Sequence, residues 1–174
     1  FAREPTSRRV VARAESRDLV HWTNARLVVE LPEQDDPADW STYGMSTFSY
    51  EGLYLGLLRV FHSDREIDLE LAFSRDDRSW MRTTPGKPFI PLGPGGSYDA
   101  GMVFSSNSPI AVGDELWFYY GAFTRDHADS GSDQSASIGL AKLRRDGFVS
   151  FDGNDSGGEF VTKPLLTDAD QLRI

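Results

Sequence analysis

The sequence of 174 residues contains no cysteine, which excludes disulfide bonds, thiolate metal ligands and a cysteine nucleophile. It has no run of 18 apolar residues, so no segment is long enough for a transmembrane helix. A helical period of 3.6 residues is almost absent as well. These absences predict an all-β protein.

Positive charge is scarce, because 18 Lys and Arg residues stand against 27 Asp and Glu residues and give a net charge of −9. An acidic surface repels phosphate backbones and anionic lipids. We therefore expect neither nucleic acid nor a membrane as a partner. The charge fits a neutral or cationic substrate and, more simply, solubility.

Common catalytic signatures are missing too. There is no Gly-x-Ser-x-Gly elbow and no His-Glu-x-x-His motif. The glycines at 93–96 lack the Lys-Ser/Thr of a phosphate loop. We expect no cofactor and no catalytic metal. The alternative is a structural calcium, held by Asp126, Asp129 and Asp133 or by residues 152–155. Neither spacing matches an EF-hand loop.

The chain consists instead of short apolar or alternating runs separated by Gly, Pro, Asp and Ser, which is typical of β-strands. The clearest runs are 53–58, after Glu51-Gly52, and 116–120, after Gly113-Asp114. Their nearly continuous hydrophobicity predicts strands that are buried on both faces.

An internal repeat is the strongest pattern. The motif Ser-Arg-Asp-x-x-x-Trp occurs at 16–22 and, 58 residues later, at 74–80, and a Gly-Met pair occurs within 43–45 and again within 100–102. We expect the Ser and Asp to cap a tight turn and the Trp to pack between sheets. Four strands per repeat predict a partial β-propeller with four-stranded antiparallel blades, and an ordinary β-sandwich is the rival architecture.

The repeat also predicts domain boundaries, with a propeller fragment over 1–158 and a following blade or C-terminal β-sandwich beginning at 159–174. Both ends of the chain look like cuts, so a signal peptide would lie upstream. Within the fragment, the predicted parts are the end of one blade at 8–31, a second blade at 39–84 and a third at 97–151.

Functional side chains are expected at one end of the blades. Antiparallel strands alternate in direction, so the long loops 60–66, 85–98 and 124–137 should gather there, and long loops on a rigid scaffold commonly carry binding sites. Glu70, in mid-strand, faces either a neighbouring blade or this rim. The side chains predicted to bind substrate at this end are Trp40, Tyr43, Arg59, His62, Tyr98, Arg125 and His127.

Asp99 and Asp39 are the candidate catalytic carboxylates at the same rim. Paired carboxyl groups cleave glycosidic bonds, one as the acid and the other as base or nucleophile. Each residue also has a simpler interpretation, Asp99 as a turn residue and Asp39 as part of an acidic surface loop.

Three phrases, at 16–22, 99–103 and 113–121, resemble the five-bladed propeller glycosidases of glycoside hydrolase families 32 and 43. The tracts 145–150 and 162–165 resemble the region that leads into a C-terminal β-sandwich in family-32-like bacterial proteins. The family 32 motifs Trp-x-Asn-Asp-Pro-Asn and Glu-Cys are absent. The resemblance implies a carbohydrate-active fold and leaves the substrate open.

The sequence thus predicts a glycosidase-like protein that acts on carbohydrate through carboxylates at the mouth of the propeller channel. A secreted or periplasmic location goes with this hypothesis. A non-catalytic carbohydrate-binding propeller and a purely structural module are the alternatives.

Overall fold

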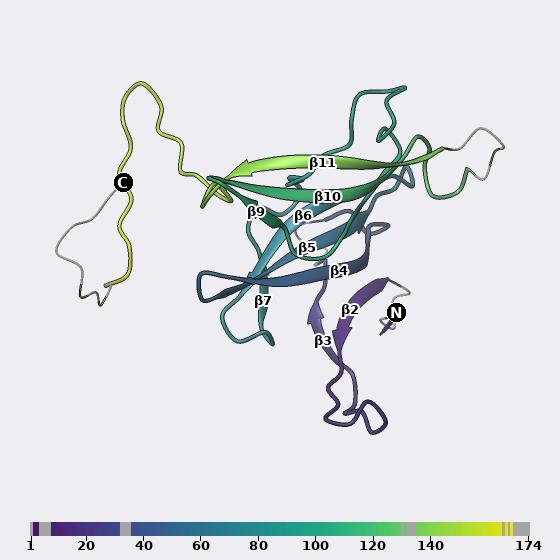
Figure 1. The fold of residues 1–174 in the computed structure, drawn as a ribbon, viewed down its shortest axis with the longest axis horizontal. Helices are drawn as coiled ribbons and strands as arrows, with labels where there is room; N and C mark the ends of the chain where they lie inside the picture. Colours follow the sequence, from purple (N-terminus) through teal and green to yellow (C-terminus); the bar gives the residue numbers. More distant parts are fainter. Residues whose placement is uncertain are drawn as a thin grey trace.

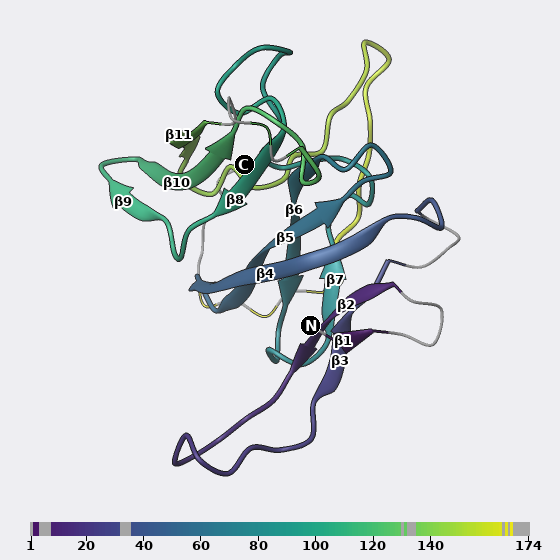
Figure 2. The same ribbon diagram turned by 90° about the vertical axis from the view of Figure 1, so that its right-hand side faces the viewer.

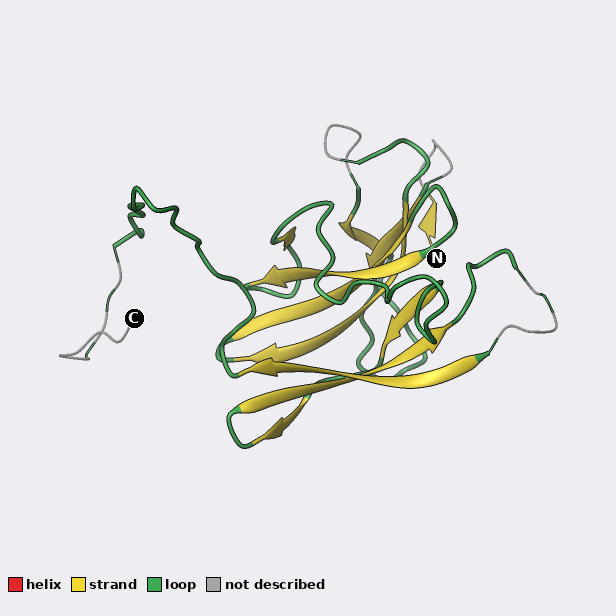
Figure 3. Ribbon diagram, turned by 90° about the horizontal axis from the view of Figure 1, so that it is seen from above, coloured by secondary structure: helices red, strands yellow, loops and turns green. Residues whose placement is uncertain are grey.

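The computed structural model describes residues 2–3, 8–31, 36–129, 131, 135–164, 166 and 168, and it contains strands and no helix in these parts (Figure 3). The all-β prediction is confirmed. The strands are β1 (Ala2–Arg3), β2 (Arg9–Arg13), β3 (Arg26–Val29), β4 (Ser41–Tyr50), β5 (Leu53–Phe61), β6 (Ile67–Ser74), β7 (Trp80–Arg82), β8 (Met102–Ser105), β9 (Ile110–Val112), β10 (Glu115–Phe123) and β11 (Ala136–Arg144).

The strands form three stacked layers, which Figure 2 shows from the side. The first layer is β1–β3, the second is the antiparallel sheet β4–β7, and the third contains β8–β11. One parallel pairing, Ile67 with Met102, links the second and third layers into a continuous path. The sheets are open rather than closed into a ring. The β-propeller remains a prediction.

Burial explains the strand sequences. One core cluster lies between the second and third layers and includes Leu57, Leu69 and Phe118, and another lies against the first layer and includes Val29 and Leu58. Because the second layer is covered on both faces, β5 is buried at most positions, as predicted, and β6 is buried at nearly every position although it contains Asp68 and Glu70.

β10 differs from the prediction of burial on both faces. Its buried and less buried residues alternate, with Leu116 and Phe118 facing the core and Tyr119 38% exposed. The third layer has a covering layer on one face only within the described residues, so its central strand alternates.

The repeated Ser-Arg-Asp motif forms the same turn twice, as predicted. Asp18 Oδ1 accepts hydrogen bonds from the amides of residues 20 and 21, and Asp76 Oδ1 accepts them from the amides of residues 78 and 79. The tryptophans differ between the two copies. Trp80 packs against the second core cluster, whereas Trp22 is 57% exposed, so packing between sheets is wrong for Trp22.

The chain after β11 departs from a four-stranded third unit. Residues 145–164 contain one isolated bridge, between Asn154 and Gly157, and no further strand (Figure 1). Phe148 packs against the first core cluster, so the chain stays anchored up to that residue. The boundary predicted at 159 stays a prediction.

Candidate functional site

One end of the second and third layers collects the long loops. β5 and β10 end there, and β4, β6, β8 and β11 begin there, as antiparallel pairing requires (Figure 1, right). The backbone amide of His127, after β10, donates to the carbonyl of Arg65, after β5, at 3.0 Å. The two loops therefore lie together, and we call this part of the molecule the loop end.

Four rings meet at the loop end, and we call them the ring cluster: Tyr43, Phe61, Phe104 and His127. The ring centroid of Tyr43 lies 6.1 Å from that of Phe61, 6.2 Å from that of Phe104 and 4.9 Å from that of His127. The hydroxyl of Tyr43 also hydrogen-bonds His127 Nε2. Residues far apart in sequence thus form one aromatic surface across two layers.

Two arginines lie over these rings. Arg9 Cζ, from the first layer, is 4.7 Å from the Tyr43 centroid and 5.8 Å from the Phe61 centroid. Arg59 Cζ is 5.7 Å from the Phe104 centroid. All three distances suit cation–π attraction. Arg59 is half-buried, and burial lowers the pKa of its guanidinium.

A histidine–carboxylate pair lies beside the ring cluster. His62 Nε2 is 3.0 Å from Asp68 Oδ2, an ion-pair distance whose alignment is poor for a hydrogen bond, and the Trp40 ring lies edge-on to His62 at 4.1 Å. Burial alone would lower the pKa of His62. The nearby carboxylates, above all Asp68, outweigh burial and raise the pKa of His62 above its ordinary value.

Glu66, in the same loop, carries a carboxyl group whose pKa is raised. Burial first, and then the negative charges of Asp64 and Asp126, raise the pKa of Glu66 above its ordinary value. The His62 amide donates to the carbonyl of Glu66 at 3.0 Å, which fixes this residue next to the pair. A carboxyl group that holds its proton more firmly is suited to act as an acid.

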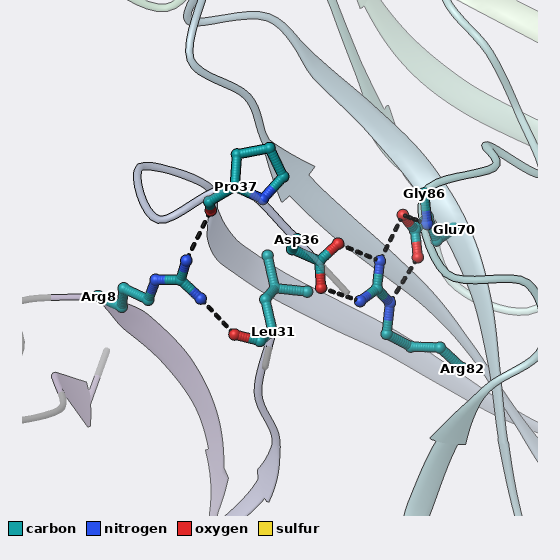
Figure 4. Close-up of polar contacts among 7 residues, drawn as sticks. All are labelled: Arg8, Leu31, Asp36, Pro37, Glu70, Arg82 and Gly86. Carbon is teal, nitrogen blue, oxygen red and sulfur yellow. Dashed lines mark hydrogen bonds and ion pairs between the residues drawn. The ribbon is translucent and has the colours of Figure 1, made fainter. Parts of the chain in front are cut away.

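A buried ion cluster anchors the loop that carries Asp39 and Trp40 (Figure 4). Arg82 forms two contacts with Glu70, at 2.6 and 2.7 Å, and two with Asp36, one of them at 2.9 Å. Glu70 is therefore occupied by Arg82, which also pairs with Asp36.

Arg8 holds the same loop from the first layer. Its guanidinium donates to the backbone carbonyls of Leu31 and Pro37 (Figure 4). It also donates to the carbonyl of Ala38, at 2.9 Å. A loop fixed by two arginines presents its side chains in a defined position. Asp39 is exposed on this loop, and Trp40 is half-buried against His62.

Asp99 is fully engaged with other side chains. It is 8% exposed; its Oδ1 accepts from Ser97 Oγ at 2.6 Å and its Oδ2 accepts from the Tyr120 hydroxyl at 2.9 Å. Because the Tyr120 hydroxyl donates its hydrogen bond to Asp99, the hydroxyl of Tyr98 is the donor in its 3.0 Å hydrogen bond with Tyr120. Burial, reinforced by these partners, raises the pKa of Tyr120. The arrangement fixes the loop before β8.

The predicted binding residues therefore divide into two groups. Tyr43, Arg59, His62, His127 and Trp40 gather at or beside the ring cluster. Tyr98 belongs to the hydrogen-bonded chain around Asp99, and Arg125 pairs with Asp129. The catalytic roles of Asp99 and Asp39 stay predictions.

Five residues at the loop end are not among those predicted from the sequence: Arg9, Phe61, Phe104, Glu66 and Asp68. For Asp68 the sequence is misleading, because residues 67–71 alternate apolar and acidic residues and so suggest a solvated face rather than a buried partner. For Arg9, Phe61 and Phe104 the sequence offers no signal, since only the stacking of layers brings them together.

No group of three or more His, Asp or Glu side chains among the described residues is placed to hold a metal ion. Asp133, one of the predicted calcium ligands, lies outside these residues. No helix in the described parts has the length and apolarity to cross a bilayer.

Comparison with known proteins places the fold but gives no family. No family model matches the chain, and no curated protein matches it. Among solved structures, an N-acetylgalactosamine deacetylase from F. plautii, in complex with blood group B trisaccharide, matches with a TM-score of 0.58 and 18% identity. A family 117 glycoside hydrolase from the marine bacterium Zobellia galactanivorans matches with a TM-score of 0.60 and 18% identity, and a protein described as a glycoside hydrolase with 0.55 and 19%.

These matches cover 78%, 77% and 86% of this chain but only 41%, 38% and 41% of the respective neighbours. The chain therefore spans about two fifths of the length of the structures that it resembles. At this level of identity the likeness is one of fold, which the chain shares with parts of two glycoside hydrolases and a deacetylase. The more specific resemblance to families 32 and 43 stays a prediction.

Proposed function

We propose that this chain is part of a carbohydrate-active, glycosidase-like β-propeller whose stacked layers are blades, and that it binds a glycan at the loop end. The observation that carries the proposal is the ring cluster, flanked by Arg9 and Arg59 on a glycosidase-like fold. Sugar faces are apolar and their edges are polar, so rings together with polar side chains are a suitable binding surface.

Hydrolysis would require a carboxylic acid and a carboxylate on either side of the scissile bond. Asp39 and Asp99 are the pair proposed from sequence, and Glu66 is added because its raised pKa suits the acid role. Asp39 is exposed and free to meet a substrate. The engagement of both oxygens of Asp99 favours the second candidate function, a non-catalytic carbohydrate-binding module.

Binding is tested with the full-length protein on a panel of oligosaccharides, by calorimetry. Tyr43→Ala is expected to weaken glycan binding about tenfold or more, because it removes the ring that contacts the other three. Tyr54→Ala is the matched control, since Tyr54 is an exposed tyrosine near the opposite end of β5 from Phe61. The absence of binding to any member of the panel would refute the proposal.

Turnover is tested by release of reducing ends in Asp39→Asn, Asp99→Asn and Glu66→Gln. An enzyme should lose turnover in at least two of these variants while glycan binding persists. A wild-type protein that binds a glycan but cleaves none supports the binding module instead.

A further inference from the structure

Arg59 lacks the polar partners that the other well-placed arginines have. Within the described residues, Arg8 donates to three carbonyls and Arg82 to two carboxylates, and Arg125 pairs with Asp129. Among the described residues Arg59 forms no ion pair, and its buried Nε has no hydrogen-bond partner there. Its guanidinium lies over the Phe104 ring, and this contact supplies no acceptor for Nε.

An unpaired, half-buried cation is costly to the folded state. Buried polar groups nearly always have partners, and an uncompensated charge in a poorly solvated position destabilises a protein. The lowered pKa of Arg59 has the same cause, because burial disfavours the charged form. Such a group calls for an explanation, and a ligand that supplies the missing acceptors is one.

The backbone next to Arg59 is shaped to admit the guanidinium. Pairing of β4 with β5 shifts register between Thr42 and Met45, and Gly44 in this irregularity has a φ of +114°. A Cβ atom at Gly44 would lie 3.0 Å from Arg59 Nη2 and 3.3 Å from Cζ. A glycine within a strand commonly marks a close approach of this kind.

A second cation acts at the same place. Arg9 lies over Tyr43 and Phe61, and within the described residues its guanidinium has no carboxylate partner either. In a chain with a net charge of −9, two unpaired guanidinium groups over one ring cluster form a local positive surface. The net negative charge of the chain fits a neutral or cationic substrate, but the local charge at the ring cluster is positive.

We propose that the ring cluster receives an anionic group of a glycan, a carboxylate or a sulfate ester, and that Arg59 binds it with Arg9 in support. This inference rests on the proposed function and names its substrate class. A guanidinium group presents planar donors that match two oxygens of a carboxylate or sulfate. The rings meanwhile offer an apolar surface to the sugar that carries the anion.

The test compares three oligosaccharides of the same backbone, one neutral, one with a uronate and one with a sulfate ester. Affinities for the full-length protein are measured by calorimetry, for wild type and Arg59→Gln. We expect wild type to prefer an anionic glycan, and Arg59→Gln to lose about tenfold to a hundredfold in affinity for it alone. The two anionic ligands distinguish a carboxylate from a sulfate.

Arg75→Gln is the matched control, because Arg75 is exposed and its side chain forms no hydrogen bond or ion pair with the described residues; it should change neither affinity nor melting temperature. Arg59→Gln should leave the melting temperature unchanged or raise it, since it removes an unpaired charge. A clear fall in the melting temperature of Arg59→Gln would show a structural role and overturn the inference.

Equal affinity for neutral and anionic glycans, unaffected by Arg59→Gln, would overturn the inference and leave the proposed function intact. A protein that binds no glycan at all would refute both.

Discussion

Replacing Arg82 by methionine is the most demanding test of the fold that supports the loop end. The side chains of Arg82, Asp36 and Glu70 are 5%, 0% and 2% exposed. Methionine keeps the apolar stem and removes the cation between the two carboxylates. Removing one partner of a buried ion pair costs about 3–5 kcal/mol, and we expect the upper end because one substitution leaves two carboxylates without their cation.

The loss should depend on pH in a defined direction. Burial raises the pKa of Glu70 above its ordinary value even with Arg82 present, and without Arg82 the pKa rises further. A carboxyl group with a higher pKa in the folded than in the unfolded state stabilises the fold at low pH, and this contribution is lost as the pH rises through the folded-state pKa. Arg82→Met should therefore be less destabilised, relative to wild type, at pH 5 than at pH 8.

Urea unfolding, followed by tryptophan fluorescence, measures the change, because Trp80 lies two residues from Arg82 and packs against the second core cluster. Arg75→Met is the control and should stay within about 0.5 kcal/mol of wild type. Adding Glu70→Gln to Arg82→Met removes one unpaired charge and should restore part of the stability. A loss below about 1 kcal/mol, or the same loss at pH 5 and pH 8, would refute the reasoning.

Two further predictions concern the loop end. Gly101→Ala should lower stability by about 1–3 kcal/mol in thermal unfolding, because its Cβ would collide with the backbone of Arg125. Gly95→Ala is the control and should be neutral, because nothing lies within 4 Å of a Cβ there. Equal effects of the two substitutions would contradict the close contact between Gly101 and Arg125. Asp68→Asn should lower the pKa of His62, measured by NMR titration of the ring protons. The stabilisation from the His62–Asp68 pair is present below about pH 6.5 and is lost as the pH rises through the raised pKa of His62. If the pKa of His62 is the same in Asp68→Asn as in wild type, Asp68 is not the cause of the raised pKa.

Local chemistry accounts for what the sequence predicted well. The Ser-Arg-Asp turns form because an aspartate oxygen reaches amides two and three residues ahead, and this depends on no distant part of the chain. The turns at Glu51-Gly52 and Gly113-Asp114 are local as well, because Gly52 and Gly113 adopt the positive φ that glycine tolerates. The burial of β5 on both faces is also visible in its nearly continuous apolar sequence, whereas the alternating start of β6 gives no such indication.

Long-range pairing accounts for what the sequence did not reveal. Asp36 stands in an acidic stretch that suggests a solvated loop, yet its partner Arg82 is 46 residues away and both are buried. Asp99 similarly depends on Tyr120, 21 residues away. The alternation of β10 depends on whether a further layer covers the third one, which no local pattern determines.

Arg82 and Arg59 differ in their partners, and this difference separates a structural arginine from one that is available to a ligand. Both guanidinium groups are removed from much of the solvent, but the fold supplies Arg82 with two carboxylates and supplies Arg59 with none among the described residues. The buried Arg82 is therefore neutralised by carboxylates, and this cluster holds the loop that carries Asp39 and Trp40. Since stability alone would favour replacing or pairing Arg59, its position against Gly44 and Phe104 is best explained by an acceptor that arrives from outside. If Arg59→Gln were less stable than wild type, this distinction between a structural and a ligand-binding arginine would not hold.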